Sequence, residues 1–254
     1  MFVSCSTLCF SREPLESALR HMAELEFDKM ELAVVEDGPH LRPSVAAENP
    51  EAALQRLRLG PSLIPSGLTL DFGALAPDDP VLRKRFDAMC RLAKTLTVAV
   101  LTVPAAPAGT PFEDEVKRLA ALSGTATRAG LVLSLETHGK TLTADPAAAV
   151  ELCKAVPGLG LTLDPSHYVQ AGVKDYDAVF PYVQGVLLRD TGKGPNEFQV
   201  RVGQGEIEYG RIVNLLERHG YDRSLTVAVY DALDNPFDVE VEVRKLKLLL
   251  ESLL

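Results

Sequence analysis

Residues 131–167 read LVLSLETHGKTLTADPAAAVELCKAVPGLGLTLDPSH, and this stretch contains a complete strand, helix and second strand. Leu131–Glu136 and Gly160–Asp164 are short apolar runs of strand length, and polar residues follow each of them. Between them, Asp145 and Pro146 predict the start of a helix, because aspartate caps helix N-termini and proline fits the first helical position. Two strands joined through a helix lie parallel in one sheet.

The same alternation of short apolar run, polar loop and helical spacing recurs along the whole chain. The predicted strands are Phe2–Leu8, Lys29–Val35, Gly67–Phe72, Thr97–Val103, Leu131–Glu136, Gly160–Asp164, Gly185–Arg189 and Leu225–Tyr230. Eight strands alternating with helices favour a closed barrel, and an open doubly wound sheet is the alternative. No Gly-x-Gly-x-x-Gly follows the first strand to support nucleotide binding there. We therefore expect an α/β protein, a single (β/α)8 TIM barrel over residues 1–254.

The amino-acid composition limits the kinds of molecule that this protein is expected to bind. The 254 residues are 46% hydrophobic and carry a formal charge of −9, which disfavours nucleic acid because phosphate backbones are anionic. No run approaches the roughly 18 apolar residues of a membrane helix, and Met1–Phe10 lacks a basic leader, so we expect a cytoplasmic protein with no membrane partner. A homo-oligomer is left open.

The remaining local patterns give three further expectations. The four cysteines form no Cys-x-x-Cys pair and are predicted to be reduced and mostly buried, with Cys5 and Cys9 in a strand. Residues 239–253 fit both a strand and a helix, and their length favours the helix. Pro104–Pro111 and Gly192–Phe198 are the loops predicted to move over a site.

Polar residues gather where the predicted strands end, which is the face that carries chemistry in such barrels. Glu136 and Asp164 end neighbouring strands, so their carboxylates are expected about 4 to 6 Å apart. Such a pair requires a proton or a cation between its members, and this indicates a raised pKa or a divalent metal. The alternative is that one carboxylate caps the following loop. His167 follows Asp164 by three residues and is a candidate acid or base.

Other strand-end residues have simpler explanations. Arg189 and Asp190 predict an internal ion pair or an anion clamp, and the ion pair is favoured. Glu31, inside an apolar strand, is expected to hydrogen-bond locally, because a buried charge requires partners. Asp71 and His40 also lie at or after strand ends.

These motifs together resemble the xylose isomerase-like barrel superfamily, which contains sugar isomerases and epimerases. The resemblance rests on their order along nearly the whole chain: Phe27–Leu32, Leu133–His138, Leu163–His167, Leu188–Asp190 and Val202–Tyr209. It implies a metal-assisted isomerase in which Glu, Asp, His and a final Glu hold one divalent ion. Glu136 and Asp164 match two of these ligands, and His167 matches a histidine that faces the substrate.

The other two ligand positions differ from the pattern, because the metal histidine aligns with Leu187 and the final glutamate with Ala228. Weak Mg²⁺ or Mn²⁺ binding by Glu136 and Asp164 is therefore the most that we expect, and otherwise no cofactor. Endonuclease IV-like chemistry is disfavoured because its three metals require more histidines.

The function expected from the resemblance is isomerase- or epimerase-like proton transfer next to a carbonyl of a sugar or polyol. Glu136 and His167 are the expected catalytic residues. The expected substrate-binding residues are His138, Arg189, Asp190 and Arg201. The alternatives are a barrel that binds a sugar or a partner without catalysis, and a metal-free lyase that uses Glu136 and His167.

Overall fold

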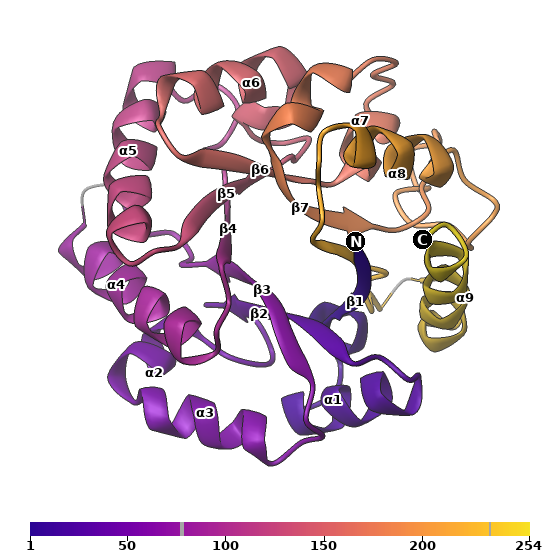
Figure 1. The fold of residues 1–254 in the computed structure, drawn as a ribbon, viewed down its shortest axis with the longest axis horizontal. Coiled ribbons are helices and arrows are strands. Elements are labelled where there is room, and N and C mark those ends of the chain that lie inside the picture. Colours follow the sequence, from indigo (N-terminus) through magenta and orange to yellow (C-terminus); the bar gives the residue numbers. More distant parts are fainter. Residues whose placement is uncertain (77–78, 234) are drawn as a thin grey trace.

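Parallel strands form a closed barrel in the order β1 to β8, with β1 hydrogen-bonded to β8 (Figure 1). The computed structural model describes residues 1–76, 79–233 and 235–254. The strands are β1 Phe2–Ser6, β2 Lys29–Val35, β3 Ile64–Asp71, β4 Val100–Pro104, β5 Val132–Glu136, β6 Leu159–Leu163, β7 Val183–Leu188 and β8 Ser224–Val227. The predicted TIM barrel is confirmed.

Helices surround the barrel in Figure 1 and cover the outward faces of its strands. They are α1 Leu15–Glu24, α2 Pro43–Glu48, α3 Pro50–Arg58, α4 Pro80–Thr95, α5 Phe112–Arg128, α6 Pro146–Ala155, α7 Pro165–Gln170, α8 Tyr209–Arg218 and α9 Val239–Glu251, with 3-10 turns at Thr7–Phe10, Leu142–Ala144 and Asp177–Tyr182. Residues 239–251 are thus helical, as their length predicts. No helix in the described ranges has the length and apolar character needed to cross a membrane.

The capping residues explain where these helices begin. Asp145 accepts a hydrogen bond from the Ala147 N–H at the start of α6, and Pro146 occupies the first helical position. Asn49 before α3 and Asp79 before α4 cap their helices in the same way. Side-chain acceptors at these positions satisfy N–H groups that have no partner within the helix.

The predictions for Cys9 and for the ends of several strands require correction; β3 begins at Ile64 rather than Gly67, and β8 ends at Val227 rather than Tyr230. Cys9 lies in the 3-10 turn Thr7–Phe10 rather than in a strand, because Ser6 ends β1 and its side chain accepts the Leu8 N–H. The fourth strand begins at Val100 rather than Thr97, because Thr97 has a φ of 58° in the turn after α4. All four cysteines are free and buried, as expected.

The inside of the barrel is unusually polar. Alternate residues of a strand face opposite sides of a sheet, and the inward positions carry many hydroxyls. The Ser4 and Thr226 hydroxyls lie 2.9 Å apart, and the Thr162 hydroxyl lies 2.8 Å from those of both Thr102 and Ser134. Interiors of such barrels are usually filled by branched apolar side chains. The apolar core here therefore lies mainly between the strands and the helices.

Candidate functional site

Asp164 lies at the centre of the strand-end cluster, directly after β6, and is fully buried. Its Oδ1 accepts a hydrogen bond from the Ser166 N–H at 3.1 Å, and Asp164 thereby caps α7. The same oxygen accepts a hydrogen bond from the Ser166 hydroxyl. Its Oδ2 lies 2.8 Å from Nη1 of Arg189. Asp164 is therefore both the cap that the simpler sequence interpretation expects and a member of an ion pair.

Arg189 follows β7 and contacts residues after the neighbouring strands β6 and β8, with 1% of its surface exposed. Its Nε donates to the Ala228 carbonyl at 2.8 Å, and its Nη1 donates to the Ser166 hydroxyl at 2.7 Å. The guanidinium carbon lies 4.3 Å from the centre of the Tyr230 ring and 4.9 Å from that of Phe198. These contacts fix one positive charge inside the site.

The carboxylate of Glu136 is the second acidic group of the cluster. Glu136 ends β5 and pairs in register with Thr162 of β6. Burial and the nearby Asp164 carboxylate raise the pKa of Glu136 to about 8, although Arg189 acts in the opposite direction. The proton and the cation that two neighbouring carboxylates require are thus both present, on Glu136 and on Arg189.

His167, on α7, joins the cluster to an open cavity. Its Nε2 lies 3.9 Å from Asp164 Oδ2, and its ring centre lies 4.0 Å from that of His138 and 4.7 Å from that of Phe198. Burial lowers the pKa of His167 to about 4, so its imidazole is neutral at pH 7. His138, His167 and Phe198 line a cavity of about 580 Å³, together with Gly139, Lys140, Gln170, Ala171 and Pro195.

The amino-acid sequence matches a known protein family. A model of the family described as "Xylose isomerase-like TIM barrel" matches residues 19–249. The chain belongs to this family. No curated protein matches the chain by sequence.

Solved structures of xylose isomerase-like proteins are similar over the whole chain. A xylose isomerase domain protein from Alicyclobacillus acidocaldarius superposes with a TM-score of 0.75 at 16% identity, covering 100% of this chain and 98% of the other. A Mycobacterium smegmatis barrel protein in complex with magnesium gives 0.74 at 16%, covering 99% and 97%. A D-tagatose 3-epimerase-like protein gives 0.71 at 19%, covering 100% and 98%. At these identities the likeness shows a shared fold.

The strand-end cluster contains some of the ligands that a metal centre would require. Ligand atoms of Glu136, Asp164 and His167 all lie within 4.8 Å of one another, so the cluster offers three potential ligands. The two further ligand positions expected from the resemblance hold Leu187 and Ala228, which are buried and have no donor side chain. Arg189 already pairs with Asp164 at 2.8 Å. The side chains present therefore do not fit the four-ligand metal centre.

Two predicted substrate-binding residues lie elsewhere. Asp190 does not pair with Arg189; its Oδ2 accepts the N–H groups of Gly203 at 2.7 Å and Gly205 at 3.1 Å, so it holds the loop before α8. Arg201, in the same loop, is exposed. The favoured ion pair at Arg189 does exist, but its partner is Asp164.

The remaining polar residues expected at strand ends form local hydrogen bonds or contacts. Asp71 accepts the Gly73 N–H after β3. His40 is buried, with its Nε2 3.1 Å from the Glu13 carbonyl. Glu31 accepts the Ser6 hydroxyl at 2.7 Å, the local bond that the sequence predicts.

Sequence reasoning missed Ser166, Phe198 and Tyr230 as partners of Arg189. The predicted strand Leu225–Tyr230 would carry a signal for Tyr230 by two-residue alternation with Thr226 and Ala228, but β8 ends at Val227 and Tyr230 lies beyond it. Ser166 and Phe198 lie in a short helix and a loop, where no periodic pattern indicates direction.

Proposed function

We propose that this family member is an isomerase- or epimerase-like enzyme that transfers a proton next to the carbonyl of a sugar or polyol. The observation that carries the proposal is a half-buried carboxyl, Glu136, in the same cluster as the fixed, buried cation Arg189, which lies close enough to influence the Glu136 pKa. Proton transfer next to a carbonyl requires a base and a positive group that stabilises the oxyanion as it forms. The family and the fold of the epimerase-like neighbour support the same class of reaction.

The substrate would bind in the cavity beside His138, His167 and Phe198. Nη2 of Arg189 is buried and has no hydrogen-bond partner among the described residues, so it would bond the carbonyl oxygen of a substrate that reaches past His167 into the cluster, since Arg189 does not itself line the cavity. The Glu136 carboxylate removes the proton from the neighbouring carbon, the C–H electron pair forms the enediolate, and Arg189 stabilises the oxyanion. Return of the proton to the former carbonyl carbon, with transfer of the hydroxyl proton from the neighbouring oxygen to the former carbonyl oxygen, gives the isomer. The epimer would form if water delivered a proton to the opposite face of the original carbon while Glu136 kept the one that it removed.

His167 has a supporting role in this proposal. Its imidazole is neutral at pH 7, because burial lowers its pKa to about 4, and it can donate or accept a hydrogen bond with a substrate hydroxyl. Mg²⁺ or Mn²⁺ would find at most a weak site at Glu136 and Asp164, because Arg189 already neutralises Asp164. No step of the proposal therefore passes through a metal.

Deuterium exchange tests this proposal directly. The protein is incubated in D₂O with a panel of ketoses, keto-inositols and their phosphates, and deuterium next to the carbonyl is followed by NMR. We expect wild-type exchange that persists in EDTA and falls at least about 100-fold in Glu136→Gln. Glu113→Gln, an exposed carboxylate in α5, is the matched control and should exchange like the wild type.

The other outcomes separate the alternatives. If the protein removes water from a keto-inositol, and this reaction requires Glu136, the enzyme would be a lyase and not an isomerase. Stabilisation by a sugar without exchange would indicate a barrel that binds without catalysis, which the Leu187 and Ala228 substitutions favour as the second candidate. Exchange that EDTA abolishes, together with metal measured by elemental mass spectrometry, would contradict the role given to Arg189.

A further inference from the structure

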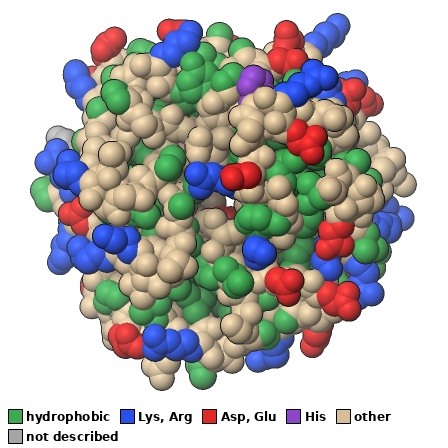
Figure 2. Space-filling model, viewed as in Figure 1, with side chains coloured by type: hydrophobic (Ala, Val, Ile, Leu, Met, Phe, Trp, Pro, Cys, Tyr) green, Lys and Arg blue, Asp and Glu red, His purple; other side chains and the backbone are tan. Residues whose placement is uncertain are grey.

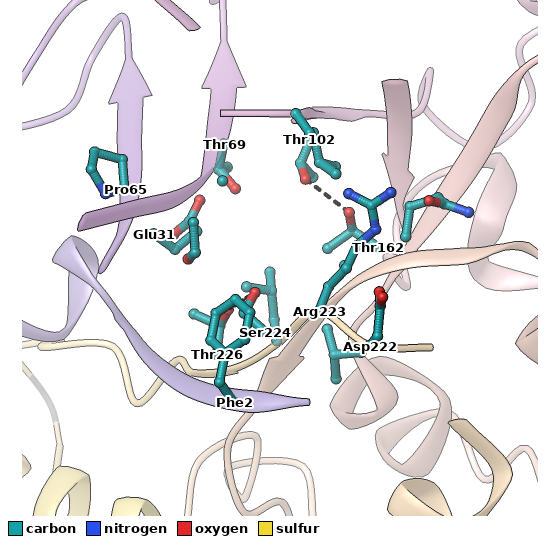
Figure 3. A pocket seen from close by; sticks show the side chains of 18 of the residues that line it. Phe2, Glu31, Pro65, Thr69, Thr102, Thr162, Asp222, Arg223, Ser224 and Thr226 are labelled. Atoms are coloured by element: carbon teal, nitrogen blue, oxygen red, sulfur yellow. Dashed lines mark hydrogen bonds between the residues drawn. The ribbon is translucent and has the colours of Figure 1, made fainter. Parts of the chain in front are cut away.

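A second cavity opens at the end of the barrel opposite to the candidate site. Its volume is about 440 Å³, and it extends from the beginnings of the strands to the middle of the barrel. Figure 2 shows the centre of the visible face hollowed, with basic and acidic side chains beside the opening. Figure 3 shows Glu31 and Thr69 on one side of the space and Thr102 and Thr162 across it.

The cavity exists because the inward-facing side chains at this level are small. Gly67 of β3 and Gly185 of β7 line it, where comparable barrels carry branched apolar side chains. A Cβ placed on Gly67 would meet nothing closer than the Glu31 Cγ at 3.8 Å. The threonines that complete the wall are too short to fill the axis of the barrel. Neither wall glycine has a positive φ, so backbone conformation does not require glycine at either position.

Glu31 brings a carboxyl group with one unpartnered oxygen to this cavity, and burial raises its pKa, so a bound cation would favour its carboxylate form. Glu31 is only 6% exposed to solvent. Its Oε2 accepts a hydrogen bond from the Ser6 hydroxyl at 2.7 Å. Oε1 is buried and has no hydrogen-bond partner among the described residues. A buried carboxylate oxygen without a partner costs free energy, so the fold favours an occupant that satisfies it.

The lining indicates the chemistry of that occupant. The groups near Glu31 are hydroxyl oxygens, of which Thr102 and Thr162 already bond to each other at 2.8 Å. Arg223 is the one basic side chain among the described residues of the lining, and it precedes β8 beside Asp222, which has the opposite charge. Oxygen ligands suit hard cations, and divalent ions generally bind where two or more carboxylates meet.

We propose that this cavity binds a monovalent cation of about the size of K⁺, held by Glu31 and the threonine hydroxyls and completed by water. One carboxylate balances one positive charge, and the volume accommodates the ion together with several waters. The cavity opens at the end of the barrel opposite to the proposed catalytic cluster, and the proposal does not depend on the proposed reaction, although Glu31 is close enough to Glu136 to contribute to its raised pKa.

Ion-specific stabilisation tests the site without any substrate. Melting temperatures are measured in KCl and in tetramethylammonium chloride at equal ionic strength, since the organic cation is too large to be coordinated by these oxygens. An ion present at ten times its Kd should raise the wild-type Tm by about 3 °C. Glu31→Gln should abolish this difference, and Glu217→Gln, an exposed carboxylate in α8, should retain it.

Crystals of the wild-type protein soaked in RbCl provide a measurement that does not depend on how the variants fold. Anomalous scattering within coordination distance of Glu31 Oε1 would support the proposal. A cavity that contains only water, with equal Tm values in the two salts, would overturn it. A K⁺ effect of the same size in Glu31→Gln would also overturn it, because the ion would then bind elsewhere.

Discussion

Burial, rather than distance, distinguishes the ion pairs of this protein. Arg189 and Asp164 lie 2.8 Å apart with 1% and 0% of their side chains exposed, whereas Arg12 and Asp231 lie 2.7 Å apart with Arg12 57% exposed. An exposed pair contributes little because water screens it, while a buried charge that loses its partner is strongly destabilising. Two pairs of nearly equal length therefore have very different consequences on mutation.

Arg189→Met is expected to lower the free energy of unfolding by about 3 to 5 kcal/mol, because it leaves Asp164 buried without a cation. Arg12→Met, the matched control, should leave the denaturation midpoint close to that of the wild type, because water screens the exposed guanidinium. Urea denaturation at pH 7 measures both values. Equal effects of the two substitutions would show that the Asp164 carboxyl does not depend on Arg189.

The pKa of Glu136 predicts how stability changes with pH. The folded protein holds a proton on Glu136 up to about pH 8, whereas the unfolded chain releases it near the ordinary value of 4.5. Between these values the folded state binds more protons, so its stability falls as the pH rises. Glu136→Gln should remove this loss and be roughly 1 to 3 kcal/mol more stable than the wild type at pH 8.5.

Denaturant midpoints at pH 4.5 and 8.5 check this expectation, and the gain of the variant should be confined to the higher pH. Deuterium exchange next to the carbonyl should follow the opposite course. Its rate should rise as the pH approaches about 8, because the carboxylate form of Glu136 acts as the base. A rate that does not change between pH 6 and 9 would exclude Glu136 as that base.

At the scale of elements, the loop between β7 and α8 depends on one side chain. Asp190 accepts N–H groups from Thr191, Gly203 and Gly205, and it is 3% exposed. Asp190→Ala would leave these N–H groups without their acceptor and should cost about 2 to 3 kcal/mol. Hydrogen exchange should show faster exchange in residues 200–206 while the barrel strands stay protected.

A second loop carboxylate gives the comparison for Asp190. Glu206 pairs with Lys193 at 2.8 Å, but both side chains are more than half exposed. Glu206→Ala should therefore leave exchange in residues 200–206 close to the wild-type rate. If both variants accelerate exchange equally, the loop is held by its general packing and not by the Asp190 hydrogen bonds.

Elements were predictable from the sequence where local chemistry determines them. The Asp145-Pro146 start of α6 and the apolar runs of β2 and β5 follow from capping and periodicity, and both recur in the structure. The convergence of Glu136, Asp164 and His167 followed from the rule that strand ends meet at one face. The partner of Arg189 did not follow, because tertiary packing decides which neighbouring strand end a long side chain reaches.

At the scale of the whole molecule, closure of the barrel joins the two ends of the chain. β8 pairs with β1 in register from Phe2 with Ser224 to Cys5 with Val227, and α9 then packs against β1 and β8. Deletion of residues 224–254 would remove a partner from both β1 and β7 and expose the apolar face that α9 covers. We expect that truncated chain to be unfolded by circular dichroism.

A circular permutant separates the need for closure from the need for a particular chain order. The last helix of a βα unit returns the chain toward the end of the barrel where strands begin, so residue 254 and residue 1 can be joined by a short Gly-Ser linker. New termini between Pro61 and Ser62, in the surface connection from α3 to β3, interrupt no strand or helix. Because every strand pair and helix contact is kept, this permutant should retain the wild-type circular dichroism spectrum and a Tm within about 5 °C. A permutant that fails to fold would show that the order in which the βα units are joined, and not closure alone, determines this barrel.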